Sequence, residues 1–98
     1  MINSPVNERL HAVVEGYVQG VGFRYFVRDT AQSLRLSGWV RNRWNGSVEV
    51  MAEGPRLLLE KLLAALYRGP RAADVHGVQP EWLPASGEFR DFSVRGSG

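Results

Sequence analysis

The order of apolar segments along the 98-residue chain predicts an α/β (α+β) fold, a sandwich in which two helices cover one face of a mainly antiparallel sheet. Two observations support this prediction. Alternating, valine-rich segments and segments with helical spacing follow one another as strand, helix, strand, strand, helix, strand. The Asn45-Gly46 pair also predicts a hairpin between the two central strands. This order is the split β-α-β, or ferredoxin-like, arrangement with one short additional strand, and right-handed crossovers place both helices on the same face.

The first half of this arrangement begins after a polar segment. Residues 1–8 are predicted to form a flexible N-terminal tail, whereas residues 9–17 alternate and are rich in valine, which predicts a strand. Residues 23–36 are predicted to form an amphipathic helix, because their apolar side chains recur three and four residues apart. The residues of this stripe are Phe23, Phe26, Val27, Thr30, Ala31 and Leu34.

The next two strands are predicted over residues 38–43 and 47–53, and their faces determine the length of the loop between them. A two-residue loop would place arginines opposite core valines. A three-residue loop over residues 44–46 instead pairs Val40 with Val50 on the core face and puts the glycine of the loop in a left-handed bulge position. We therefore predict the three-residue loop.

A second helix is predicted between two glycine-proline pairs. Gly54-Pro55 opens it, with proline at the first helical position, and Gly69-Pro70 ends it. The predicted buried stripe consists of Leu59, Leu62, Leu63 and Leu66.

The remainder of the chain is predicted to add two strands. Residues 74–79, with a continuation to residue 83, form the fourth strand, and residues 89–95 form the last one. Residues 96–98 are predicted to be a frayed C-terminal tail, so that residues 9–95 make up one domain.

The connection between the first strand and the first helix, residues 16–24 (GYVQGVGFR), lacks the usual features of a helix start. Its glycines allow the backbone to turn tightly and to point successive N–H groups at one place. Only Gly22 stands where a side chain would normally cap the helix, and Arg24 adds a cation at the positive end of the helix dipole. Glycine-rich turns are common and their spacing alone is weak evidence, but free donors beside a guanidinium indicate an anion site.

The predicted topology brings a second polar side chain to this loop. The strands over residues 9–17 and 38–43 run parallel, so their carboxyl ends and the start of the first helix lie at one end of the sheet. Asn42 falls on the core face at that end, where an asparagine is costly unless its polar atoms are bonded. Arg24 can hold two phosphoryl oxygens and Asn42 can bind a water, an arrangement suited to phosphoryl transfer with a good leaving group.

Composition disfavours several other kinds of protein. The chain has no cysteine, and His11 and His76 stand alone rather than at a metal-ligand spacing, so we expect no metal and no cofactor. The net charge of +2 does not favour a nucleic-acid partner, and the aromatic-basic signature of RNA-binding modules with this topology is lacking. Because we find no long apolar segment or signal peptide, we expect a cytoplasmic monomer that does not bind membranes.

Three segments carry a resemblance to a known family. Residues 16–24, residues 38–42 (GWVRN) and residues 46–50 (GSVEV) closely resemble the acylphosphatase family, and Gly54 and Gly69-Pro70 fall at the family's spacings. The resemblance covers nearly the whole chain.

The chain departs from the family pattern in two turns. It has Arg35-Leu36 where the family usually has Gly-Leu, and Asn45 where the family often has aspartate. Neither departure touches the predicted site.

The resemblance implies an enzyme that hydrolyses the carboxyl–phosphate bond of a small-molecule acyl phosphate to a carboxylate and inorganic phosphate, without a metal. It implies that Arg24 binds the phosphate and that Asn42 orients the attacking water. The loop residues whose N–H groups would bind the phosphate are Gln19, Gly20, Val21, Gly22 and Phe23. Phosphate or sulfate should then act as an inhibitor. The predicted site offers no clear base, which leaves a phosphoryl oxygen of the substrate as the proton acceptor.

Two points remain open from the sequence. Such domains also occur inside larger carbamoyl-transfer proteins, so a non-catalytic or accessory domain is an alternative, although the absence of attached zinc modules favours a free-standing enzyme. Trp44, at the predicted hairpin tip, could either border the site or simply be exposed.

Overall fold

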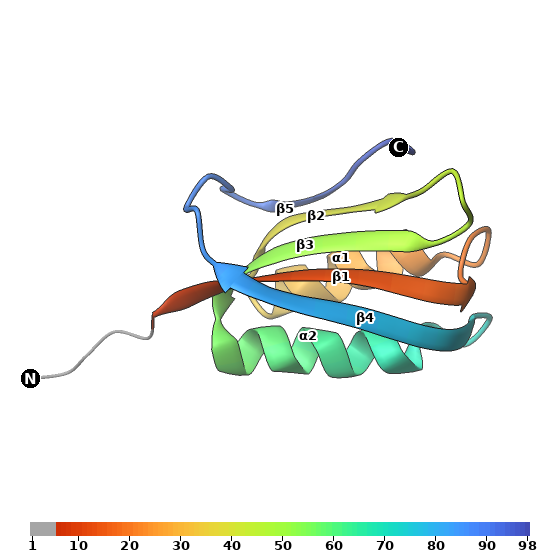
Figure 1. The fold of residues 1–98 in the computed structure, drawn as a ribbon, viewed down its shortest axis with the longest axis horizontal. Helices are drawn as coiled ribbons and strands as arrows, with labels where there is room; N and C mark the ends of the chain where they lie inside the picture. The colour runs from red at the N-terminus through yellow and green to blue at the C-terminus, as the bar shows by residue number, and fades with distance from the viewer. Residues whose placement is uncertain (1–5) are drawn as a thin grey trace, which may run out of the picture.

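The computed structural model describes residues 6–98, which form a five-stranded sheet with two helices packed on one face (Figure 1). The elements, in chain order, are β1 (Asn7–Tyr17), α1 (Phe23–Ser33), β2 (Ser37–Asn42), β3 (Val48–Pro55), α2 (Arg56–Arg68), β4 (Asp74–Pro84) and β5 (Phe92–Val94). The strand order across the sheet is β4-β1-β3-β2-β5, and every neighbouring pair is antiparallel except β2 with β5. This confirms the predicted fold class.

The β2–β3 hairpin has the register that was predicted from which side chains must face the core. Val40 lies opposite Val50, and Asn42 lies opposite Val48. Gly46 has a φ of 93°, a left-handed conformation that glycine adopts without steric cost. The three-residue loop is therefore confirmed, together with the position of Asn42 at the carboxyl end of β2.

The predicted end of α1 at residue 36 is wrong, because the helix stops at Ser33. Arg35 turns into the left-handed region with a φ of 57°, and the N–H of Leu36 donates to the carbonyl of Ala31 at 2.9 Å. This is how a helix is commonly closed when glycine follows it. The turn leaves Leu36 free to enter the core, where it is buried. Arg35, with its left-handed φ, stands where the family that this chain resembles usually has glycine.

Other boundaries differ from the prediction by smaller amounts. β1 begins at Asn7 rather than residue 9, which leaves residues 1–6 of the predicted tail, and residues 1–5 of these lie outside the described residues. Pro55 is not the first helical residue but ends β3 in an extended conformation and precedes α2 as its N-cap. The β2 and β3 strands are each shifted by one residue from the predicted start. β4 reaches Pro84, one residue beyond the longer of the two predicted extents.

The C-terminal end of the chain is more ordered than a frayed tail. β5 comprises three residues instead of the predicted seven, but the chain continues beside β2 beyond it. The N–H of Arg95 donates to Val40, and the N–H of Gly98 donates to the carbonyl of Asn42 at 3.0 Å. Gly98 in turn accepts from the N–H of Trp44.

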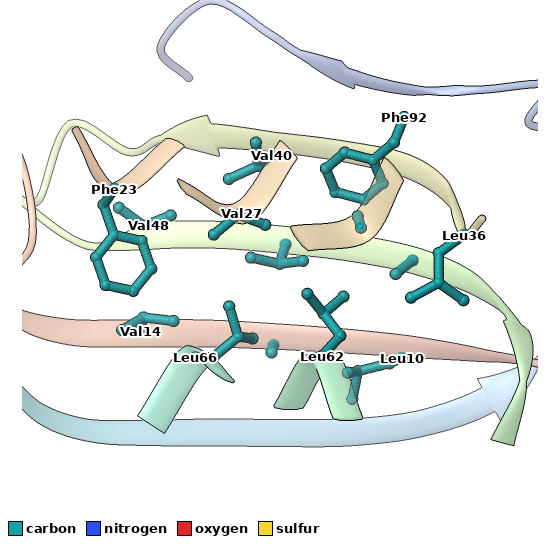
Figure 2. Close-up of a cluster of buried hydrophobic side chains, with 14 of the residues drawn as sticks. Leu10, Val14, Phe23, Val27, Leu36, Val40, Val48, Leu62, Leu66 and Phe92 are labelled. Atoms are coloured by element: carbon teal, nitrogen blue, oxygen red, sulfur yellow. The ribbon is translucent and has the colours of Figure 1, made fainter. Parts of the chain in front are cut away.

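The core lies between the sheet and the two helices (Figure 2). Val27 and Phe23 of α1, and Leu62 and Leu66 of α2, pack onto the apolar face of the strands. Burying a side chain of this size stabilises a fold by about 1.5–3 kcal/mol. Because Phe23 is the first residue of α1 and is only 1% exposed, the core fixes the point at which this helix begins.

On the other face of the sheet, a buried carboxylate holds the connection between β4 and β5. Glu53 of β3 is 4% exposed and accepts hydrogen bonds from Arg9 and from the N–H groups of Ser86 and Gly87. Burial alone would raise the pKa of Glu53, but the bonds from Ser86, Gly87 and Arg9 outweigh it and hold this pKa below its ordinary value. These bonds hold the loop between β4 and β5 against β3 at Ser86 and Gly87.

The lowered pKa of Glu53 predicts a specific loss of stability in acid. The stabilisation is fully present above the unfolded-state pKa, near 4.3, and is lost as the pH falls through the folded-state pKa. We expect Glu53→Gln to lower the free energy of unfolding at pH 7 by roughly 1–3 kcal/mol and to flatten its decline between about pH 5 and pH 3. Urea unfolding at several pH values measures both effects. Glu60→Gln, at an exposed carboxylate paired with Arg56, is the control and should keep the wild-type slope. Equal slopes in wild type and Glu53→Gln would contradict the prediction.

Candidate active site

The carboxyl ends of β1 and β2 and the first turn of α1 meet at one end of the molecule, on the right in Figure 1. A cavity of about 170 Å³ lies there. A single water needs ~10–15 Å³, so the cavity admits a considerably larger group. The residues that line it are Val18, Gly20, Gly22, Phe23, Arg24, Tyr25 and Asn42. Residues from two segments far apart in the sequence thus line one cavity, at the end of the sheet where the predicted topology brings them together.

The loop over residues 18–22, here called the glycine loop, has the conformation that its glycines permit. Gly20 and Gly22 have φ values of 73° and 78°, in the left-handed region where a side chain is strained. Val18 and Phe23 are both buried and anchor the two ends of the loop in the core. The loop is therefore held at its ends while its backbone borders the cavity.

The start of α1 is uncapped, as predicted. Gly22 occupies the N-cap position without a side-chain hydrogen bond, and the first turn contains no acidic residue. The first N–H groups of an α-helix have no partner within the helix, and they carry the positive end of its dipole. At this position they favour an anion in the cavity.

Arg24 supplies the cation of the site. It is half-buried, lines the cavity and, among residues 6–98, forms no salt bridge and no side-chain hydrogen bond. By contrast, Arg9, Arg41 and Arg56 of the same structure are paired with carboxylates. The guanidinium of Arg24 is thus available to hold two oxygens of a bound anion.

Asn42 supplies an unsatisfied acceptor. Its Oδ1 is buried and has no hydrogen-bond partner within the described part of the chain. An acceptor left in this state costs about 1–3 kcal/mol, which is unusual in a native protein unless the atom has another purpose. Because Asn42 also lines the cavity, a carboxamide with an unused acceptor stands beside the space that Arg24 borders.

The predicted phosphate-binding residues do not all face the cavity. Gly20, Gly22 and Phe23 line it, whereas Gln19 and Val21 are not among the lining residues. The side-chain amide of Gln19 instead donates to two backbone carbonyls of the β2–β3 hairpin.

Two other aromatic residues can now be placed. Tyr25, 53% exposed, lines the cavity and was missed by the sequence interpretation, although its position directly after Arg24 in the first helical turn could have indicated it. Trp44 is 83% exposed at the hairpin tip and borders a separate hollow formed with Arg43, Asn45 and Gly98. Of the two interpretations of Trp44, the structure supports the exposed residue.

Comparisons with known proteins show what the whole chain is similar to. The family model described as acylphosphatase matches residues 10–94. An acylphosphatase of Pelotomaculum thermopropionicum is 49% identical over 86 residues, which cover 88% of this chain and 94% of that protein. The crystal structure of acylphosphatase from Bacillus subtilis superposes with a TM-score of 0.87 at 36% identity, covering 90% of this chain and 98% of that one. Full-length HypF, solved in a phosphate- and nucleotide-bound form, superposes with a TM-score of 0.88 at 28% identity. The superposed residues make up 97% of this chain but 12% of the HypF chain.

Neither helix of the described residues, 6–98, has the length and the apolar character that a membrane span requires.

Proposed function

The chain belongs to the acylphosphatase family, and on this basis we propose that it hydrolyses acyl phosphates by attack of water at phosphorus, without a metal or a covalent intermediate. It is an acylphosphatase, with a small acyl phosphate as its substrate. The observation that carries the proposed mechanism is that Arg24, which is unpaired within residues 6–98, and Asn42, whose Oδ1 has no hydrogen-bond partner there, line the same cavity.

In this mechanism the glycine loop and Arg24 bind the phosphoryl group. The N–H groups of the loop and of the first helical turn donate to its oxygens, and the guanidinium holds two of them in a planar fork. Positive charge gathered around the phosphoryl oxygens stabilises the charge that shifts onto them as the bond to the leaving group breaks.

Asn42 binds the attacking water. Its Oδ1 accepts a hydrogen bond from the water and fixes one lone pair of the water oxygen toward phosphorus, and its Nδ2 can donate to a phosphoryl oxygen. The new P–O bond forms as the bond from phosphorus to the carboxyl oxygen breaks, and the carboxylate leaves with that electron pair. The water proton passes to a phosphoryl oxygen of the substrate.

The polar side chains that line the cavity are a guanidinium, a carboxamide and a phenol. These groups orient and stabilise, and the leaving carboxylate requires little acid assistance because it is a weak base. This supports a reaction that depends on position and electrostatics rather than on a nucleophilic side chain.

Inorganic phosphate is expected to bind the same cavity as a product and to inhibit competitively. We expect titration with phosphate to shift the backbone amide resonances of residues 20–24 in ¹H–¹⁵N spectra, because these N–H groups border the anion. The dissociation constant from this titration should equal the competitive inhibition constant measured with acetyl phosphate as the substrate. Shifts confined to other parts of the chain, or inhibition that is not competitive, would argue against this site.

A further inference from the structure

We propose that Gln19 is a positioning residue, whose side-chain amide ties the glycine loop to the base of the β2–β3 hairpin and so sets the place of Asn42 relative to the bound phosphoryl group. This inference rests on the proposed roles of Arg24 and Asn42. It gives Gln19 a task different from the phosphate contact that its place in the loop suggests.

The geometry of the tie is specific. The Nε2 of Gln19 donates to the backbone carbonyl of Arg43 at 2.8 Å and to that of Ser47 at 2.8 Å. Arg43 and Ser47 face each other across the base of the hairpin, where the N–H of Arg43 donates to the carbonyl of Ser47. Arg43 directly follows Asn42, so the tie is one residue away from the side chain that would hold the water.

Each of the two carbonyl oxygens also accepts a hydrogen bond from a backbone N–H group. The carbonyl of Arg43 also accepts from the N–H of Gly46 at 3.1 Å, and that of Ser47 accepts from the N–H of Arg43 at 2.9 Å. Loss of the amide would therefore leave neither oxygen without a donor, and the hairpin would keep its own bonds. The amide adds a link between two segments that lie 24 and 28 residues apart in sequence.

Each of the two segments has restraints of its own, the hairpin in its bonds to Gly98 and within its turn, and the loop in its buried ends, whereas the amide of Gln19 joins one segment to the other. The glycine loop contains two residues at positive φ, and the tip of the hairpin is exposed at Trp44. Glycine gives the loop backbone a wide choice of conformations. Without the tie, the hairpin base and the loop can separate, and a displacement of Asn42 by a fraction of an ångström is enough to misdirect the water.

Phosphate binding should depend much less on this link. Val18 and Phe23 are each 1% exposed and hold the two ends of the glycine loop in the core, independently of the hairpin. The predicted signature of Gln19 is thus a lower kcat with little change in phosphate affinity. If Gln19 merely supported the fold, its loss would lower the unfolding midpoint without lowering kcat selectively. If Gln19 bound phosphate, its loss would weaken phosphate affinity more than it lowers kcat.

The test is a double-mutant cycle with Gln19→Leu and Asn42→Ala, in which kcat, KM for acetyl phosphate, the inhibition constant of phosphate and the unfolding midpoint are measured for each protein. Gln32→Leu is the matched control, because the side-chain amide of Gln32 likewise donates to a backbone carbonyl, that of Phe92 at 3.2 Å, away from the cavity. If Gln19→Leu does not fold, Gln19→Met, which keeps the unbranched length of the side chain, takes its place in the cycle.

We expect Gln19→Leu to lower kcat roughly tenfold, to change the phosphate inhibition constant by less than about threefold, and to have almost no further effect once Asn42 is alanine. Gln32→Leu should keep the wild-type kcat. An equal fall in kcat in both backgrounds, or a loss of phosphate affinity with unchanged kcat, would overturn the positioning role while leaving the proposed mechanism intact. A normal kcat in Asn42→Ala alone would instead remove Asn42 from the mechanism, and the role of Gln19 with it.

Discussion

Arg24→Ala is expected to lower kcat/KM for an acyl phosphate by roughly 10³-fold or more and to weaken inhibition by phosphate at the same time. Arg24 would pair with the phosphoryl charge both in the bound substrate and in the transition state, so its loss should affect binding and turnover together. Arg24→Lys should recover little of the activity, because an ammonium group is a point charge that cannot reproduce the planar fork of the guanidinium. Steady-state kinetics and phosphate inhibition constants measure both effects.

Arg56→Ala is a suitable control for the Arg24 variants. Arg56 also stands in the first turn of a helix, but it pairs with Glu8 and Glu60 and is remote from the residues that line the cavity. It should keep the wild-type kcat/KM. Loss of activity in Arg56→Ala equal to that in Arg24→Ala would show that the kinetics report general damage to the protein rather than the site.

Asn42→Ala is expected to lower kcat by roughly 30- to 1000-fold, which corresponds to about 2–4 kcal/mol of barrier, the scale of a lost oriented hydrogen-bonding group. The inhibition constant of phosphate should change much less, because Asn42 carries no charge for the anion. Kinetics and phosphate inhibition of the purified variant separate the two effects.

Stability supplies a second and independent readout for Asn42→Ala. Since Oδ1 is buried without a partner in the described structure, alanine removes an unsatisfied group rather than a hydrogen bond. The free energy of unfolding should therefore be unchanged or higher than that of the wild type, in spite of the lower kcat. A variant with reduced stability and near-normal kcat would show that Asn42 supports the fold and does not take part in the reaction.

The sequence predicted those features that follow from alternation and chain direction. The pairing of Val40 with Val50 could be derived because a two-residue loop would place arginines opposite core valines, and this register placed Asn42 at the carboxyl end of β2. The uncapped start of α1 and the position of Arg24 followed in the same way from local residue preferences. These features depend on few residues that are close in sequence or paired by one hairpin.

The features that were missed depend on contacts between distant segments or on unfavourable local conformations. α1 stops at Ser33 because Arg35 adopts a left-handed φ that an arginine seldom takes. The loop before the last strand is held at Ser86 and Gly87 by the carboxylate of Glu53, which lies on a different strand. Likewise, no pattern around Gln19 could show that its amide reaches the hairpin base, 24 residues away.

The most direct test of the proposed mechanism follows the oxygen of the attacking water. Acetyl phosphate is hydrolysed by the protein in H₂¹⁸O in the presence of a chelator, and the products are analysed by mass spectrometry, with Arg24→Ala as the control for uncatalysed hydrolysis. Attack at phosphorus without a metal predicts undiminished turnover, with ¹⁸O in inorganic phosphate and none in acetate. Incorporation of ¹⁸O into acetate, or loss of turnover in the chelator, would contradict the mechanism.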